Sequence, residues 1–151
     1  MMMTDNFYPG DLAQYFSVIH RAFLHETHAS YQKLHLNATS AYILVLLCKT
    51  GPQNQNFIAK TLLISKGQIT REIRHLKAMS YVTQQVSDQN HAHNIISLTP
   101  QGCQILSQVE LIRNQWWQDR LDFNQVNDDS LFEPTLRKIA QELIQRSKKE
   151  S

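Results

Sequence analysis

Glycine, proline and cysteine are scarce in this sequence, which has four, four and two of them among 151 residues. So few glycines and prolines argue against a loop-rich β protein and favour long helices. The two cysteines, Cys48 and Cys103, are too few for a disulfide framework or a four-cysteine zinc site. We expect Cys48, which ends an apolar run, to be a small core residue. A reactive thiol at Cys103, in the first turn of a predicted helix, is the less favoured alternative.

Long apolar segments are also missing. The longest apolar run, residues 41–48, is far shorter than the roughly 20 residues that a membrane-spanning helix needs. The N-terminal methionines lead into the polar residues Thr4, Asp5 and Asn6 and not into the apolar stretch of a signal peptide. These absences predict a cytoplasmic protein without a membrane partner.

Motifs that carry catalysis are absent as well. The sequence has no glycine-rich phosphate loop, no G-x-S-x-G and no H-E-x-x-H. His25 and His28 stand three residues apart on a predicted helix and could share a metal ion, but zinc takes three or four protein ligands and no second pair accompanies them. We therefore expect that the protein is not an enzyme and that it binds neither a cofactor nor a metal ion.

What the sequence does have is enough apolar material for a core and an uneven distribution of charge. Apolar residues make up 42% of the chain, and its length suits one domain. Residues 53–98 hold five lysines and arginines against two acidic residues, a net charge of +3, whereas the rest of the chain carries −1. Such a basic segment is typical of a module that binds a polyanion, although a solvated helix face would give the same count.

Apolar spacing predicts the order α-α-α-α-β-β-α-α, a mainly α fold. Gly51–Pro52 ends one predicted helix, and Thr99–Pro100 begins another. Ser65 and Gln68 fit a capping box, in which each side chain satisfies the backbone N–H of the other residue. The predicted helices are 10–34, 38–50, 54–63, 65–79, 99–123 and 131–148, and the predicted strands are 81–85 and 94–98.

The centre of the chain predicts a winged helix-turn-helix. Helices 54–63 and 65–79 are joined by a tight turn at Leu63–Ile64, and a β-hairpin follows at once. At 100° per residue, one arc of the second helix would pack on the domain; it holds Ser65, Ile69, Ile73 and Leu76. The opposite arc would face outward, with Gln68 and Thr70 on its flanks; it holds Gly67, Arg71, Arg74, His75 and Ala78.

The outward arc has the chemistry of a DNA-reading surface. Arginine pairs with phosphates and with guanine edges, and glutamine pairs with adenine. The helix N-terminus at residues 65–67 offers free N–H groups to a phosphate. We therefore predict that this helix enters the major groove of double-stranded DNA. The predicted contacts are Ser65, Lys66, Gly67, Gln68, Thr70, Arg71 and Arg74.

Two stretches resemble the MarR family of winged-helix transcriptional regulators. Residues 59–82, A-K-T-L-L-I-S-K-G-Q-I-T-R-E-I-R-H-L-K-A-M-S-Y-V, resemble the helix-turn-helix core of that family without a gap. Residues 96–102, I-S-L-T-P-Q-G, resemble its passage from the wing to a long helix. The wing tip departs from the usual D-x-R of the family, because Asn90 and His91 stand there instead. We expect His91 to approach the minor groove with a weaker, pH-sensitive contact.

The resemblance implies a single-chain architecture that pairs into a homodimer and binds a pseudo-palindromic operator. Residues 1–36 and 124–151 would be the dimerisation helices, residues 37–99 the DNA-binding lobe, and residues 99–123 the long connecting helix. The interface residues that follow from this arrangement are Leu12, Trp116, Leu136, Ile139 and Leu143.

The resemblance also implies a repressor that a small molecule releases. Related regulators bind small aromatic or phenolic effectors in a cleft between the dimer helices and the winged lobe, and such an effector would change the distance between the two lobes. The implied cleft residues are Tyr15, Phe16, His20 and Tyr42. The alternative hypothesis is a winged-helix module that binds another protein, through the hairpin edge or the region of Trp116, and has no role on DNA.

Overall fold

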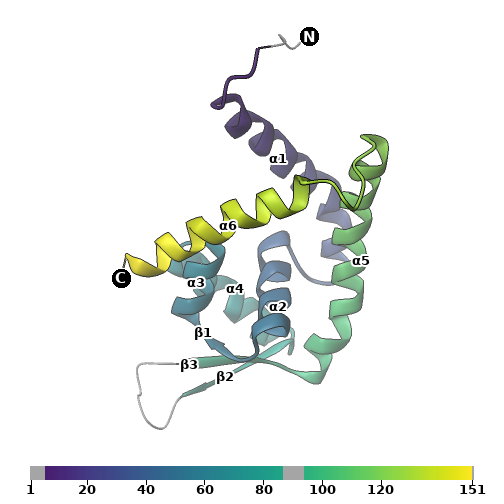
Figure 1. Ribbon diagram of the computed structural model, residues 1–151. Coiled ribbons are helices and arrows are strands. Elements are labelled where there is room, and N and C mark those ends of the chain that lie inside the picture. The colour runs from purple at the N-terminus through teal and green to yellow at the C-terminus, as the bar shows by residue number, and fades with distance from the viewer. Residues whose placement is uncertain (1–5, 87–93, 151) are drawn as a thin grey trace.

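The computed structural model describes residues 6–86 and 94–150. In these residues, three helices and three short strands form a winged lobe, and three longer helices flank it (Figure 1). The lobe contains α2 (Ala38–Thr50), β1 (Gln53–Asn54), α3 (Gln55–Leu62), α4 (Lys66–Ala78), β2 (Val82–Val86) and β3 (Asn94–Leu98). The flanking helices are α1 (Asp11–Gln32), α5 (Pro100–Phe123) and α6 (Phe132–Lys149). The predicted mainly α fold and the order of its helices and hairpin are confirmed.

Side-chain caps fix where four of the helices begin, and those of α2, α3 and α5 are complete. Asn37 accepts the Ser40 N–H at 2.9 Å while the Ser40 hydroxyl accepts the Asn37 N–H at 2.9 Å, which completes a capping box at α2. Asn54 caps α3 through the N–H of Phe57 at 2.7 Å. Thr99 caps α5, with Pro100 in the first turn. These short-range bonds explain why the helix starts agree closely with the prediction.

The capping box predicted at the start of α4 is only half formed. Ser65 Oγ accepts the N–H of Gln68 at 3.2 Å, so Ser65 is the N-cap. The return bond, from the Ser65 N–H to the Gln68 side chain, is not among the bonds of the described residues. The amide of the Gln68 side chain therefore takes no part in the cap.

The sheet has one strand more than the hairpin that the sequence predicts. Its order is β1-β3-β2, antiparallel throughout, with Gln53 opposite Ile96 and Val82 opposite Leu98. β1 is two polar residues long, so it has no period of its own that the sequence could reveal. It forms because β2 pairs with only one edge of β3, and the short segment between α2 and α3 pairs with the other edge.

The core lies where α1 to α5 and the sheet meet. The apolar run of α2 is buried on most sides, as expected, at Ala41, Ile43, Leu44, Val45 and Leu47. Cys48 contradicts the expectation that it is a core residue, because it is exposed. It stands in the last turn of α2, where the helix extends past the residues that cover it.

The flanking helices pack on one another and on the lobe. Trp116 on α5 stacks edge-on against Phe23 of α1, with ring centroids 5.2 Å apart, and its Nε1 donates to Glu26 at 2.8 Å. α6 crosses above α3 (Figure 1). Lys148 Nζ lies 4.3 Å from the ring centroid of Phe57. The N-terminal half of α1 extends away from the lobe. Within residues 6–86 and 94–150, no helix combines the length and the apolar character needed to cross a bilayer.

Candidate nucleic-acid interface

The turn between α3 and α4 sets the angle at which α4 leaves the lobe. Leu63 ends α3 in the left-handed region, with φ 52° and ψ 44°. The next N–H, that of Ile64, donates to Ala59 O at 3.1 Å and closes the helix end. Leu63 is exposed, whereas Ile64 packs against the core. The result is the tight helix-turn-helix that the sequence predicts.

α4 divides into two faces, as its spacing predicts. Ile69, Ile73 and Leu76 are at most 1% exposed and hold the helix against the core. The opposite face is exposed along its whole length; it consists of Gly67, Arg71, Arg74, His75 and Ala78. We call these five residues the outer face of α4. Neither arginine of this face is in an ion pair with another described residue, so both guanidinium groups can pair with an external anion.

Gln68 and Thr70, on the flanks of the outer face, are half-buried. The Thr70 hydroxyl lies 2.8 Å from Gln55 Oε1 and 2.9 Å from Lys66 O, two acceptors that share its one hydrogen, and the first contact connects α4 to α3. Thr70 thus helps to position α4, and its predicted contact with DNA stays a prediction. Ser65 and Lys66 are exposed at the helix start.

Glu72 is the acidic residue of α4, and it is turned away from the outer face. Both of its carboxylate oxygens accept hydrogen bonds from Asn37 Nδ2, at 3.1 and 3.2 Å. The negative charge therefore lies toward the start of α2, and the outer face keeps its positive character. His91, the predicted wing contact, lies outside the described residues.

A separate cavity of about 230 Å³ opens between α1, α2, α5 and α6. Phe16, His20 and Tyr42, three of the four residues predicted for an effector cleft, line it. Tyr15, the fourth, does not. Leu136, predicted at the dimer interface, lines the cavity as well. The remaining lining residues are Ile19, Phe23, Arg113 and Trp117.

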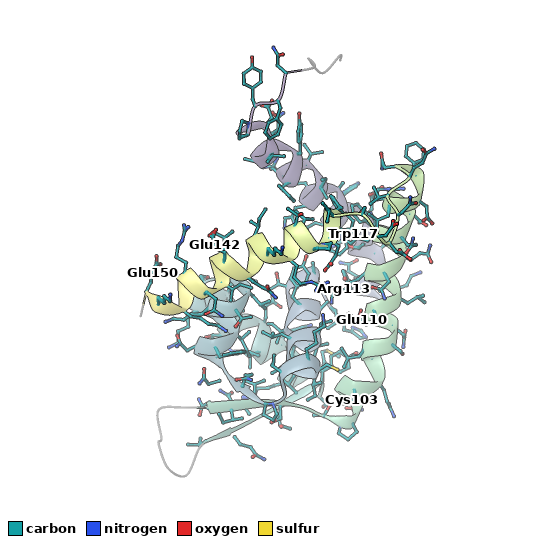
Figure 2. The ribbon with its side chains drawn as sticks, viewed as in Figure 1. Cys103, Glu110, Arg113, Trp117, Glu142 and Glu150 are labelled. Atoms are coloured by element: carbon teal, nitrogen blue, oxygen red, sulfur yellow. The ribbon has the colours of Figure 1, made fainter. Side chains whose placement is uncertain are left out.

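Arg113 and Trp117 are cavity residues that sequence reasoning missed, and Figure 2 shows both on α5, beside the start of α6. The Arg113 guanidinium carbon lies 5.9 Å from the ring centroid of Tyr42, and its Nη1 lies 3.4 Å from Glu110 Oε1. Burial raises the pKa of Tyr42, while the positive charge of Arg113 opposes that rise. The cavity therefore combines aromatic walls with one cation.

A second phenol, that of Tyr31, lies near Arg113. Tyr31 is 1% exposed, and its hydroxyl has no hydrogen-bond partner among the described residues. Burial raises the pKa of Tyr31 to about 12, and the charge of Arg113 acts in the opposite direction. Both phenols near Arg113 are thus neutral over the physiological range.

Comparison with solved structures identifies the fold. No family model and no curated protein matches the sequence. The crystal structure of MarR aligns over 99% of this chain and 99% of its own, with a TM-score of 0.78 and 20% sequence identity. The chain has the MarR fold. The transcriptional regulator BldR from Sulfolobus solfataricus has the same fold, with a TM-score of 0.80, 20% identity and coverage of 93% of this chain and 99% of that one.

Two of the similar structures, of reduced and of overoxidized AbfR, contain DNA. Reduced AbfR bound to DNA aligns over 89% of this chain and 91% of its own, with a TM-score of 0.68 and 18% identity. Because the MarR fold spans nearly the whole chain, the similarity includes the flanking helices as well as the winged lobe. The resemblance seen in residues 59–82 and 96–102 is confirmed at the level of the fold.

Proposed function

We propose that the protein is a transcriptional regulator that binds double-stranded DNA through the outer face of α4. The observation that carries the proposal is the orientation of α4. Its apolar side is buried in the core, and two arginines that form no ion pair with another described residue project from its other side. A major groove about 12 Å wide accepts one such helix. Arg71, Arg74 and Gln68 would read base edges, while Ser65, Lys66 and Gly67 at the helix start would meet a phosphate.

The proposed regulator is a homodimer. Apart from Leu63 and Val86, every large apolar side chain that is exposed in the described residues lies on α1, α5 or α6 or in the segments next to them. Leu12 is 43% exposed, Ile139 50% and Leu143 39%. A partner that repeats this surface by twofold symmetry would cover it and would place a second α4 about one helical turn of DNA away. Trp116, which packs within the protomer, would support this interface from behind.

The cavity between α1, α2, α5 and α6 is the proposed effector site. Its walls are mainly aromatic and aliphatic, and Arg113 supplies a positive charge. This combination suits a small aromatic acid, whose ring packs against Phe16 or Trp117 while its carboxylate pairs with the guanidinium group. The cavity borders both the flanking helices and α2 of the lobe. An occupant would shift the lobes relative to each other and release the operator, which is the behaviour of a repressor.

Selection of bound duplexes from a random pool at physiological salt tests the proposal. A dimer that reads DNA with two copies of α4 should enrich an inverted repeat whose half-sites are about 10 base pairs apart. The logarithm of the binding constant should then fall with the logarithm of the salt concentration by about 0.9 for each phosphate neutralised. Failure to retain any duplex would favour the alternative, a module that binds another protein.

A further inference from the structure

A groove with three histidines runs beside the outer face of α4. It encloses about 600 Å³ between the C-terminal turns of α1, the α1–α2 connection and α4. We call it the histidine groove, and the lining residues that matter here are His28, His35, Asn37, Arg71, Glu72 and His75. The groove is open to solvent and continuous with the outer face, because Arg71 and His75 belong to both.

One hydrogen bond determines which ring nitrogen of neutral His75 carries the hydrogen. Its Nε2 lies 2.7 Å from the backbone oxygen of His35. A carbonyl oxygen only accepts, so Nε2 carries the hydrogen and donates it. A neutral ring therefore has its free lone pair on Nδ1, and protonation there turns His75 into a cation without breaking the bond to His35. The side chains of His28 and His35 are exposed as well, so solvent protons reach all three rings.

The fixed charges of the groove cancel when the imidazoles are neutral. Arg71 supplies one positive charge, and Glu72, held by Asn37, supplies one negative charge. α2, α3 and β2 also pack against α4, and no charged side chain from their described residues lines the groove. Protonation of the imidazoles would therefore raise the formal charge of the groove from zero to as much as +3. Histidine is the side chain that makes this change between about pH 5 and pH 8.

We propose that the histidine groove binds a backbone phosphate at the edge of the major groove, and that it binds more tightly as the pH falls. The proposal rests on the proposed function, because the phosphate lies within reach only when α4 occupies the major groove. At least half of the hydrogen bonds between proteins and DNA go to phosphate and sugar, and they fix the position of the reading helix without selecting sequence. A protonated imidazole is a charged donor to such an oxygen. The regulator would thus hold DNA more strongly in acid than in alkali.

The test measures binding of a fluorescent duplex of random sequence, about three helical turns or 30 base pairs long, at about pH 8 and about pH 6, on either side of the histidine range. The wild-type protein should bind more tightly at the lower pH. Its salt dependence should also become steeper, by roughly 0.9 for each phosphate gained. A wild-type protein with the same affinity and the same salt slope at both pH values would overturn the proposal.

Matched variants separate this groove from the other histidines of the chain. The triple variant His28→Gln, His35→Asn and His75→Gln removes the three imidazoles. Asparagine suits position 35 because its backbone φ is 60°, and glutamine at position 75 keeps an N–H donor. The control is His25→Gln, on α1 but outside the groove. Both proteins retain His91 and His93, so any titration of the wing is common to them.

The test compares, for each protein, the affinity at about pH 6 with its own affinity at about pH 8. The control should keep the wild-type gain at the lower pH, and the triple variant should lose most of that gain. A triple variant that responds to pH as fully as the control would overturn the proposal. The single variant His75→Gln, expected to lose part of the gain, serves if the triple variant is unfolded by circular dichroism. Arg71→Ala separates a failure of the groove proposal from a failure of the proposed function. If the wild type binds at about pH 8, Arg71→Ala weakens that binding and the wild-type affinity does not change with pH, then only the groove proposal is wrong. If no protein binds the duplex at either pH, the proposed function itself is wrong.

Discussion

Gly102, in the first turn of α5, touches the backbone of Tyr81. A Cβ placed on Gly102 would overlap the carbonyl oxygen of Tyr81 and lie 3.1 Å from its carbonyl carbon. That oxygen accepts the N–H of Thr99 at 3.1 Å, and the Tyr81 N–H donates to Leu76 O at 2.9 Å. The Tyr81 hydroxyl donates to Leu34 O at 2.9 Å. Because three bonds hold Tyr81, its backbone cannot retreat, and the junction between the lobe and α5 requires glycine.

Gly102→Ala should therefore lower the free energy of unfolding by about 1–3 kcal/mol or more, since the new methyl group meets fixed backbone. Urea unfolding followed by circular dichroism measures it. Gly67→Ala is the matched control, because Gly67 is also helical and has no atom within 4 Å of the added Cβ. That change should raise stability by about 0.5–1 kcal/mol, through helix propensity. Equal midpoints for the two variants would show that the junction is looser than the contacts indicate.

The arginines of the outer face give the most direct test of DNA binding. Arg71→Ala should weaken binding to a selected operator by about 1–3 kcal/mol, which corresponds to roughly 5- to 150-fold. The control Arg137→Ala removes an exposed arginine of α6 that pairs with Glu133 at 2.9 Å, and it should leave the affinity unchanged. Anisotropy titrations at one salt concentration compare the two. If Arg71→Ala and Arg74→Ala both bind as wild type does, the outer face of α4 is not the DNA-contact surface.

Most of the fold could be predicted from the sequence because its signals are local. Asn54 and Thr99 cap helices through bonds that span three residues, and the period of the apolar residues assigns both faces of α4. β1 could not be predicted, since two polar residues become a strand only when β3 lies beside them. Cys48 was misjudged for a related reason. A run of apolar residues shows that a helix is buried, but it does not show where the covering elements end.

The candidate sites divide in the same way. The arginines of α4 are periodic with its core residues, so their orientation follows from the spacing. Arg113 has no such signal, because on α5 it stands among apolar neighbours such as Ile112 and Trp116 and could equally be a solvated cation. Only the packing of α1, α2 and α6 around it creates a cavity. The same holds for Trp117, which lines the cavity, whereas its sequence neighbour Trp116 packs against Phe23 inside the protomer.

Arg113 should select acids among the aromatic molecules that enter the cavity. Benzoate should quench tryptophan fluorescence in the wild-type protein because Trp117 lines the cavity, and Arg113→Gln should weaken benzoate binding by about tenfold through loss of the ion pair. Benzyl alcohol, which has the ring without the charge, should bind both proteins equally. Arg146→Gln, which removes a surface arginine of α6 paired with Glu142 at 3.2 Å, is the control. Equal loss of benzoate and benzyl alcohol would mean that Arg113 only shapes the cavity.

The buried phenol of Tyr31 should make stability depend on alkaline pH. Its pKa rises from 10.0 to about 12 on folding, so the fold favours the neutral ring. That stabilisation is complete below pH 10 and is lost as the pH rises toward about 12. Urea unfolding between those values should show the wild type weakening more steeply than Tyr31→Phe.

Below pH 10 the Tyr31→Phe variant should be as stable as wild type or slightly more stable, since the lost hydroxyl has no partner. Tyr42, whose pKa burial also raises, is present in both proteins and gives a common background. Tyr8→Phe, at a side chain that is 57% exposed, is the control and should follow the wild type. A Tyr31→Phe variant with the wild-type slope would place the alkaline sensitivity elsewhere.

The exposed apolar side of α6 should hold the two protomers together. Ile139 is 50% exposed and Leu143 39% exposed, one helical turn apart, so neither is needed to complete the fold of a protomer. Ile139→Asp combined with Leu143→Asp would place two carboxylates in a desolvated interface and should raise the dimer dissociation constant by about 100-fold or more. Sedimentation over a range of concentrations measures it. Leu63→Asp, at an exposed leucine of the winged lobe, should leave the dimer intact. If the double variant associates as tightly as Leu63→Asp, α6 lies outside the interface. A wild type that sediments as a monomer at every concentration would contradict the proposed dimer itself.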